Sequence, residues 1–293
     1  MLVDAVPDAG ALARRLDAVG YLADEGLATA RFLSLRLPQP LLLEGEAGVG
    51  KTEAARALAE ALGTPLIRLQ CYEGMDSAEA LYEWNYPRQL LRIRLAEASG
   101  GDVGEDDLFA REYLVRRPVL EAIEHPGPLP AVLLIDELDR ADHDFEAFLL
   151  EVLADAAVTV PELGTIRAGV PPAVVLTSNR TRDLHDALKR RCLYHWIDHP
   201  SVAREVEIVR VRAPEVPEAL AREVAEAVAR LREMDVAKRP GVAETIDWSQ
   251  ALSFLGATRL EPEQAAATLG ALVKDHEDLE LVRARLGRVL GSE

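Results

Sequence analysis

The stretch LLLEGEAGVGKTEAARAL, Leu41 to Leu58, decides the fold. It opens with three leucines, which are typical of a short buried strand. Gly45 to Thr52 then match the pattern G-x-x-x-x-G-K-[ST], and the alanine-rich residues that follow predict a helix ending at Gly63. Strand, glycine-rich loop and helix in this order predict a loop that binds the phosphates of a nucleotide.

The residue types in this phosphate loop each have a physical reason. Glycines let backbone N–H groups approach an anion closely, and the following helix directs its unpaired N–H groups and positive dipole end to the same point. Lys51 is suited to reach the β- and γ-phosphates, and the Thr52 hydroxyl is suited to bind Mg²⁺. We expect the nucleotide to contact Gly45, Glu46, Ala47, Gly48, Val49, Gly50, Lys51, Thr52 and Glu53.

Two adjacent acids follow the most apolar predicted strand. AVLLIDELDRA, Ala131 to Ala141, contains Asp136 and Glu137 at the end of this strand. Removing carboxylates from water there costs free energy unless they bind a cation. Asp136 is suited to hold Mg²⁺ through its water shell, opposite Thr52. Glu137 is suited to orient and polarise an attacking water. We call Asp136 and Glu137 the acid pair.

Further candidate residues follow the acid pair along the chain. AVVLTSNR, residues 173–180, predicts a strand with Asn179 just beyond its end. Because parallel strands deliver their carboxyl ends to one edge of a sheet, this amide is suited to hold the lytic water against the γ-phosphate.

Arg190 and Arg191 follow a helical stretch. An arginine from a neighbouring subunit can stabilise charge on the transferred phosphoryl group, and we favour Arg191 over Arg190 for this role.

Short apolar runs and helical periodicity alternate along the first two thirds of the chain. This alternation is typical of a three-layer α/β fold with a parallel sheet. From about Ser201 on, the sequence shows only helical periodicity. We expect an α/β nucleotide-binding domain over residues 1–200 and a smaller, all-helical domain over residues 201–293. The five predicted strands span residues 41–43, 65–70, 131–135, 173–177 and 193–197.

Two segments of the first domain carry additional elements. Trp84–Glu97 and Leu108–Glu124 each show helical periodicity and predict two helices. Val158–Ala168 alternates around a Pro-Glu-Leu-Gly turn and predicts a β-hairpin.

Composition and charge narrow the class of protein. The chain has 293 residues, of which 49% are hydrophobic and 28% charged, as in an ordinary soluble globular protein. It lacks an apolar run of about 20 residues and a signal-like N-terminus, so we expect a cytoplasmic protein without a membrane span. The net charge of −17 argues against broad nucleic-acid binding and favours protein partners.

Cysteine and histidine positions do not suggest a metal centre. Cys71 and Cys192 are too few for a disulfide framework and have no metal-ligand spacing. His195 and His199 lie four residues apart, which would suit a zinc site on a helix. Because this segment predicts the end of a strand, we expect ordinary histidines there.

Together, GEAGVGKT, LLIDELDRA, LTSNR and ALKRRCLYHW resemble an AAA+ ATPase. The resemblance extends to the MoxR-type branch and most closely to its CoxD-like members. FLLEVLADAAVTVPELGTI and AETIDWSQAL carry this closer likeness, which runs from about Gly20 onward. It implies ATP hydrolysis with Mg²⁺, a five-stranded parallel sheet of order 5-1-4-3-2, a helical lid and a ring, most commonly a hexamer.

The same resemblance implies a chaperone-like role in metalloenzyme maturation with a von Willebrand A-domain partner. For CoxD-like members, the implied client is a molybdenum-containing dehydrogenase of the carbon monoxide dehydrogenase type. A helical insert at about residues 84–124 and a hairpin insert at about 158–168 would line or rim a central pore. The residues expected to face the client are Tyr86, Pro161, Glu162 and Leu163.

One departure from the family pattern concerns the lid. Related ATPases often place an arginine that senses the γ-phosphate at the start of a lid helix, but here Glu244 stands near that position. Lys238 or Arg239 is a candidate substitute, and the alternative is that the sensor is missing.

Two alternative hypotheses for the function are a nucleotide-gated assembly scaffold with little turnover and a DNA-directed AAA+ ATPase. The set Glu137, Asn179 and Arg191 argues against the first, and the acidic charge argues against the second.

Overall fold

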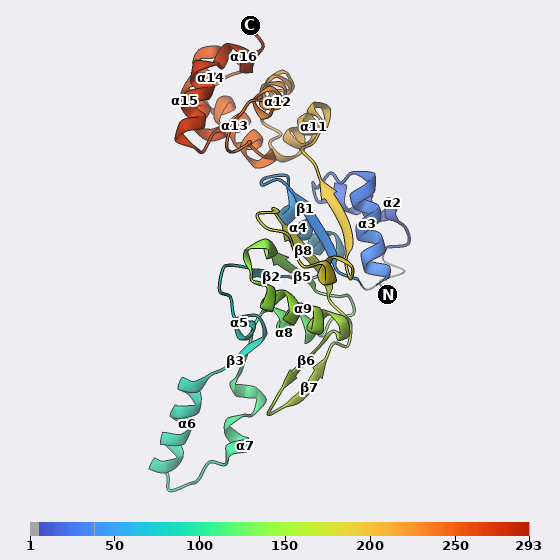
Figure 1. Cartoon of the computed structure of the whole chain (residues 1–293), viewed down its shortest axis with the longest axis vertical. Helices are drawn as coiled ribbons and strands as arrows, with labels where there is room; N and C mark the ends of the chain where they lie inside the picture. The colour runs from blue at the N-terminus through green and yellow to red at the C-terminus, as the bar shows by residue number, and fades with distance from the viewer. Residues whose placement is uncertain (1–5, 38, 293) are drawn as a thin grey trace. The chain divides into compact units, whose positions relative to one another are not determined.

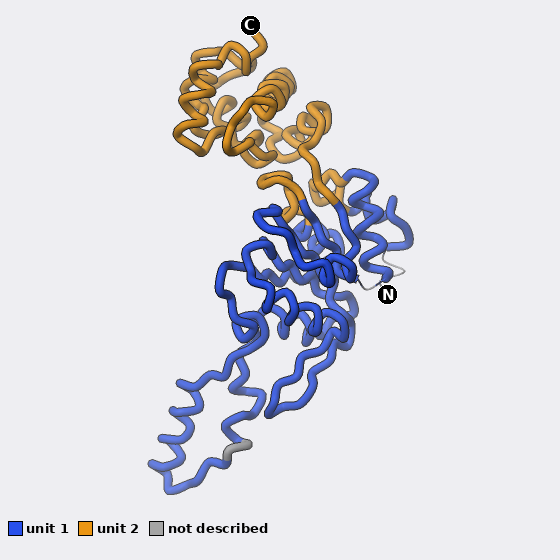
Figure 2. The backbone as a smooth tube through the Cα atoms, in the orientation of Figure 1, with its two compact units in different colours: residues 1–15, 24–44, 55–195 blue, residues 16–23, 45–54, 196–293 orange. Residues whose placement is uncertain are grey.

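The computed structural model describes residues 6–37 and 39–292 of the chain. Residues 1–5 and 293, which the predicted domain ranges include, lie outside the described residues, as does Pro38. The chain divides into two compact units (Figure 2). Unit 1 comprises residues up to 15, 24–44 and 55–195, and unit 2 comprises residues 16–23, 45–54 and 196–293. The phosphate loop therefore belongs to the same unit as the C-terminal helices.

A five-stranded sheet forms the centre of the α/β part (Figure 1). Numbered among these five strands alone, the order from one edge is 5-1-4-3-2, which is the predicted order. The labels in Figure 1 differ because two small sheets contribute the other four strands. Read from the opposite edge, the strands are β2 (Leu66–Gln70), β5 (Val132–Asp136), β8 (Ala173–Ser178), β1 (Leu41–Gly45) and β9 (Leu193–Ile197).

The strand register fixes which residues leave the sheet at the same edge. β1 pairs parallel with β8, with Glu44 opposite Ser178, and β5 pairs parallel with β8, with Ile135 opposite Leu176. β2 pairs parallel with β5, with Gln70 opposite Asp136. β1 and β5 are buried along their whole length because central parallel strands are covered on both faces. The carboxyl ends of these strands therefore lie along one edge.

Helices of unit 1 pack against this sheet to form its core. The fully buried side chains of Leu120, Leu133 and Leu149 belong to one hydrophobic cluster, contributed by α8, β5 and α9. The N-terminal and sheet-flanking helices are α2 (Ala9–Ala18), α3 (Glu25–Arg36), α4 (Lys51–Leu62), α8 (Pro118–Ile123), η2 (Leu138–Arg140), α9 (His143–Asp155) and α10 (Asp186–Lys189).

The insert differs in part from its prediction. The first predicted helix corresponds to α6 (Tyr86–Ala98), but the continuous helix predicted for Leu108–Glu124 is wrong. Pro118 occupies the first turn of α8, where proline can begin a helix but not continue one. The residues before it are α7 (Glu105–Leu108), η1 (Arg111–Tyr113) and β4 (Leu114–Arg116), and α5 (Ser77–Leu81) and β3 (Tyr82–Trp84) precede α6.

Strand pairing explains why this helix is interrupted. β3 and β4 pair antiparallel, with Tyr82 opposite Arg116 and Trp84 opposite Leu114. Trp84 therefore ends a strand instead of opening a helix, and Leu114 is buried beside it. The predicted hairpin is confirmed: β6 (Ala157–Val160) and β7 (Gly164–Arg167) pair antiparallel.

Unit 2 contains the helices that follow β9. Ser201 caps the first of them by accepting a hydrogen bond from the Arg204 N–H, and Trp248 lies fully buried in their shared core. Within residues 201–292, every regular element is a helix. We call this part the lid; it consists of α11 (Val202–Arg212), α12 (Glu218–Arg232), α13 (Val242–Phe254), α14 (Pro262–Leu272), α15 (His276–Ala284) and α16 (Leu286–Leu290).

No helix within the described part of the chain has the length and apolar character needed to cross a bilayer.

Candidate active site

Asp136 ends β5 and is almost fully buried, at 2% exposure. Its Oδ1 accepts a hydrogen bond from the Thr177 hydroxyl at 2.6 Å, and its Oδ2 accepts from the Arg68 guanidinium at 2.6 Å. These donors come from the two strands that flank β5 in the sheet. A buried carboxylate with charge-assisted hydrogen bonds is compatible with the predicted role as a Mg²⁺ ligand.

Glu137 has a different environment from its neighbour. Its backbone lies in the left-handed region, at φ 55° and ψ 48°, which non-glycine residues rarely adopt and which marks functional sites. Its N–H donates to the Thr177 hydroxyl at 2.9 Å. Its carboxylate accepts from the Gln70 amide at 3.0 Å and pairs with the Arg140 Nε at 3.1 Å. The hydroxyl of Thr177 thus binds both members of the acid pair.

Asn179 follows β8 and is held by a residue that sequence reasoning missed. Its N–H donates to Asp139 Oδ1 at 3.2 Å, while the Thr181 N–H and hydroxyl donate to Oδ2 at 2.9 Å and 2.7 Å. Asp139 is 2% exposed and lies three residues after Asp136, so a third acid in the same motif was the available signal. Unit 1 therefore brings the acid pair and Asn179 together at one strand edge.

Glu146 fixes the segment that leads from Asn179 to α10. This carboxylate is fully buried, pairs with the Arg182 guanidinium at 2.5 Å, and accepts from the His185 N–H at 2.7 Å. Sequence reasoning also missed this residue, although an acid between the apolar Phe145 and Ala147 of a helical stretch was a signal for it.

The two arginines that are candidates for acting on a neighbouring subunit lie at the end of α10. Arg190 is the C-cap residue of that helix, and the Arg191 guanidinium donates to the Leu150 carbonyl at 2.9 Å. Both residues are exposed, as a residue acting on a neighbouring subunit must be. Their role in trans stays a prediction.

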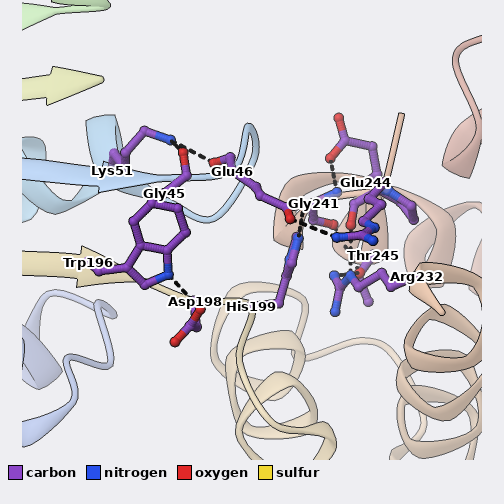
Figure 3. Close-up of polar contacts among 12 residues, drawn as sticks. Gly45, Glu46, Lys51, Trp196, Asp198, His199, Arg232, Gly241, Glu244 and Thr245 are labelled. Atoms are coloured by element: carbon purple, nitrogen blue, oxygen red, sulfur yellow. Dashed lines mark hydrogen bonds and ion pairs between the residues drawn. The ribbon is translucent and has the colours of Figure 1, made fainter. Parts of the chain in front are cut away.

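The phosphate loop in unit 2 has the backbone that its sequence predicts. Gly48 and Gly50 have φ values of +79° and +96°, which favour glycine over any side-chain-bearing residue. Lys51 opens α4, and its Nζ donates to the carbonyls of Gly45 at 2.8 Å and Glu46 at 2.6 Å (Figure 3). Further along α4, the Glu53 carboxylate pairs with Arg212 at 2.9 Å.

The Glu46 side chain contacts two residues from the C-terminal part of unit 2. Its Oε1 accepts from Arg239 Nη1 at 2.8 Å. Its Oε2 lies 3.3 Å from His199 Nε2 (Figure 3). Burial alone would raise the pKa of Glu46, but the His199 hydrogen bond and the Arg239 charge outweigh it and lower that pKa. Burial, together with the positive charge of Arg232, lowers the pKa of His199, so the ring is mainly neutral at pH 7.

The start of α13 packs directly on the phosphate loop. The Val242 N–H donates to the Gly48 carbonyl at 3.0 Å, and Gly241 touches Gly48 backbone to backbone. Glu244 accepts from the Gly241 N–H at 3.0 Å and so caps this helix (Figure 3). Of the two candidate substitutes for a lid arginine, Arg239 contacts the loop through Glu46, whereas the Lys238 ammonium lies 3.9 Å from Asp275.

No group of three or more His, Cys, Asp or Glu residues suited to a metal ion occurs in the described ranges. His195 lies 3.7 Å from Asp24 and His199 contacts Glu46, so the two histidines have separate partners. Mg²⁺ in nucleotide sites typically uses one or two protein oxygens together with phosphates and waters. Asp136 in unit 1 and the Thr52 hydroxyl in unit 2 each offer an oxygen of this kind.

Comparisons with known proteins show the family to which the chain is similar. The family model of the AAA domain of the dynein-related subfamily matches residues 40–192, more than half of the 293-residue chain. Members of the AAA+ class use ATP with Mg²⁺ and commonly form rings. The AAA+ part of the predicted resemblance is confirmed, whereas the MoxR-type and CoxD-like branches stay predictions.

Individual relatives are similar over part of their length. Chaperone protein ClpB 1 of Nostoc sp. is 33% identical over 141 residues, which are 47% of this chain and 13% of that protein. The ATP-dependent protease ATPase subunit HslU of Rhodopseudomonas palustris is 32% identical over 121 residues, 40% of this chain and 25% of that protein. The chain thus spans a quarter or less of the curated relatives it matches.

Among solved structures, the Thermotoga maritima RuvB Holliday junction branch migration motor is similar at a TM-score of 0.48 and 18% identity. This similarity covers 88% of the present chain and 71% of the RuvB chain.

Proposed function

Because this chain belongs to the AAA domain family, dynein-related subfamily, we propose that it is a Mg²⁺-dependent ATPase that remodels a protein client. One observation carries this proposal. β1, β8 and β5 are neighbours in one parallel sheet, and the phosphate loop, Asn179 and Glu137 each follow one of them at its carboxyl end. Ligands of open parallel sheets bind at this edge.

The phosphate-binding role falls to the loop and its lysine. The backbone N–H groups of Gly45–Thr52 and the Lys51 ammonium bind the phosphates, while Glu53 lies just beyond the loop. Thr52 and Asp136 supply oxygen ligands for Mg²⁺, which, when bound, neutralises charge on the phosphates. A buried carboxylate suits this task because a cation compensates its desolvation.

Glu137 orients and polarises the attacking water, and the Asn179 amide holds that water in line. The carboxylate of Glu137 accepts from Gln70 and pairs with Arg140. It must leave these partners to contact the water. In a ring, Arg191 of one subunit stabilises charge on the phosphoryl group bound by its neighbour, with Arg190 as the alternative.

The insert supplies the surface for the client. Helix α6 exposes Tyr86 at 62%, Leu91 at 58% and Leu95 at 57%, and its Leu90 is exposed at 51%. An isolated helix of 13 residues is marginal in water, so a partner that covers this apolar surface would stabilise it. The hairpin turn with Pro161, Glu162 and Leu163 is the second proposed client contact.

The finer proposal concerns which client is remodelled. The sequence resemblance to CoxD-like members favours maturation of a molybdenum-containing dehydrogenase of the carbon monoxide dehydrogenase type. A hexameric ring and a von Willebrand A-domain partner belong to the same proposal. One relative carries the printed name of a chaperone protein, which supports remodelling in general.

ATP turnover tests the enzymatic part. We expect Lys51→Ala to lose nucleotide binding and Glu137→Gln to bind ATP without releasing phosphate. Lys274→Ala and Glu151→Gln, which change exposed side chains elsewhere, serve as matched controls and should behave like wild type. Steady-state phosphate release at the wild-type rate by Glu137→Gln would refute the assignment of this residue.

The role of Arg191 in a neighbouring subunit is tested separately, by measuring ATP turnover as a function of protein concentration. Arg191→Ala should assemble normally yet hydrolyse ATP slowly, whereas Arg190→Ala should retain turnover. Full turnover by assembled Arg191→Ala together with a loss in Arg190→Ala would transfer the role to Arg190.

Binding of a purified dehydrogenase produced without its molybdenum cofactor tests the client. We expect Glu137→Gln with ATP to retain this protein, and a Leu91→Asp, Leu95→Asp double change to release it. Leu255→Asp, which alters a lid residue of 55% exposure, is the matched control. If the dehydrogenase is not retained at all while ATP turnover is normal, the client is a different protein.

A further inference from the structure

An acidic side chain stands inside the loop that is proposed to bind phosphate. Glu46 is the second residue of the Gly45–Thr52 loop, and its side chain is 42% exposed. A carboxylate near a polyphosphate repels it unless a cation compensates the charge. Glu46 therefore needs a partner if the loop is to bind ATP.

The compensation comes from residues far along the chain but in the same compact unit. Arg239 Nη1 lies 2.8 Å from Glu46 Oε1. His199 Nε2 lies 3.3 Å from Glu46 Oε2 (Figure 3). Since a carboxylate can only accept a hydrogen bond, the His199 Nε2–H is the donor. We call Glu46, His199 and Arg239 the clasp.

The clasp is linked to the phosphate-binding lysine through a single residue. Lys51 Nζ donates to the backbone carbonyl of Glu46 at 2.6 Å, while the Glu46 side chain is held by the clasp. Any change in how the clasp holds Glu46 therefore also moves a carbonyl that orients Lys51.

The segment that carries Arg239 is anchored from behind. Arg232 Nε donates to the Pro240 carbonyl at 2.8 Å, and its two terminal nitrogens bind the Glu205 carboxylate at 2.7 and 2.8 Å. The Thr245 hydroxyl donates to the same carboxylate at 2.6 Å. Glu205 and Thr245 are fully buried and Arg232 is 9% exposed, so this network gives Arg239 a rigid base.

From this geometry we propose that Arg239 and His199 are positioning residues for ATP binding: Arg239 neutralises the Glu46 carboxylate, and His199 donates a hydrogen bond to it, which together hold the loop that orients Lys51. The proposal rests on the proposed function, because it presumes that the loop binds ATP. Arg239 acts through the carboxylate and not on the phosphates themselves.

This distinction predicts how changes at Arg239 and Glu46 combine. Removing the Arg239 charge leaves Glu46 negative beside the phosphates, so ATP affinity falls. Removing the Glu46 charge removes the repulsion that Arg239 compensates. In the double variant, the loss of Arg239 no longer matters because the carboxylate it neutralised is absent.

The test is a double-mutant cycle on the dissociation constant of a fluorescent methylanthraniloyl-ATP with Mg²⁺. We expect Arg239→Gln to raise Kd about fivefold, the upper end for a half-exposed ion pair. The Glu46→Gln, Arg239→Gln double variant should have the same Kd as Glu46→Gln alone, because the Arg239 effect depends on the carboxylate. Arg239→Lys, which keeps the charge, should restore most of the affinity.

A matched control removes the same charge elsewhere in the lid. Arg210 is 58% exposed and lies 3.6 Å from Glu218, so Arg210→Gln should leave Kd unchanged. Amide exchange at Val242, whose N–H donates to Gly48, reports separately on whether the lid still contacts the loop.

A loss in Arg239→Gln that is equally large with and without the Glu46 charge overturns the proposal, because Arg239 would then act on the phosphates directly. An unchanged Kd in Arg239→Gln overturns it as well. Both results leave wild-type binding and its loss in Lys51→Ala intact, and therefore leave the proposed function standing. A folded wild type that binds no nucleotide would instead refute the proposed function and the clasp with it.

Discussion

Replacing Gly241 with alanine tests how closely the lid approaches the phosphate loop. Gly241 has φ −85° and ψ −172°, an extended backbone that alanine adopts without strain. A Cβ at this position would lie 2.5 Å from Gly48 Cα and 2.6 Å from Gly48 O. The substitution therefore adds a close contact with Gly48 without straining the backbone of residue 241.

The size of the effect follows from these distances. Ordinary contact begins at 3.4 Å, so the two backbones must separate by about 0.9 Å (3.4 − 2.5). This would stretch the bond from the Val242 N–H to the Gly48 carbonyl from 3.0 Å to about 3.9 Å, beyond hydrogen-bond range. Overpacking costs about 1–3 kcal/mol and the lost hydrogen bond about 0.5–1.5 kcal/mol, together about 1.5–4.5 kcal/mol.

Thermal unfolding followed by tryptophan fluorescence measures this cost, since Trp248 is fully buried in the lid core. We expect Gly241→Ala to lower the Tm by at least about 3 °C and to raise the exchange rate of the Val242 amide. The control is Gly270→Ala in α14, where an added Cβ meets no atom within 4 Å. That change should stabilise the protein by about 0.5–1 kcal/mol, because alanine favours a helix.

A Gly241→Ala protein with the wild-type Tm and the wild-type Val242 exchange rate would refute the reasoning. It would mean that the loop and α13 are not held in contact in solution. A loss of exchange protection without a change in Tm would instead show that the two segments separate freely, at little cost to the rest of unit 2.

Three further predictions concern hydrogen bonds around the acid pair and in the lid. Thr177→Val removes the hydroxyl that binds both acids, and we expect about 1–3 kcal/mol less stability in denaturant titration and lost turnover. Thr159→Val in the exposed hairpin should change neither quantity. Gln70→Ala removes a donor to Glu137 and should raise kcat with little change in KM; a lower kcat in steady-state assays would contradict this. Arg232→Met should destabilise the lid by about 3–5 kcal/mol in the same titration, because it leaves a buried carboxylate unpaired; a loss below about 1 kcal/mol would contradict the burial argument.

The chemistry that lies on consecutive residues could be predicted from the sequence. The spacing within Gly45–Thr52 fixes a loop, and the apolar run before Asp136 predicts a strand that ends at two acids. Because a parallel sheet aligns its strand ends, the same reasoning extends to Asn179. These inferences need only local pattern and strand direction.

Partners from other elements could not be predicted in this way. Periodicity favoured one helix over Leu108–Glu124, but pairing between β3 and β4 overrides that local preference. Gln70 lies opposite Asp136 only once the register of β2 and β5 is known. Arg239 and Glu46 are 193 positions apart, and no pattern in either segment indicates that they meet.

The sign of each charge near the start of α13 explains the positions of Glu244, within the first turn of that helix, and of Arg239, before it. A carboxylate near the first turn of α13 accepts the Gly241 N–H and lies at the positive end of the helix dipole, whereas an arginine there would add positive charge and leave that N–H without this acceptor. The cation that contacts the loop comes from Arg239, which precedes the helix and is balanced by Glu46. Since these two charges cancel, the Arg239–Glu46 pair adds little net charge beside the phosphate loop. In the proposed mechanism, Arg239 therefore influences ATP affinity by controlling a repulsion, and the influence of Arg239 should vanish when the Glu46 carboxylate is removed.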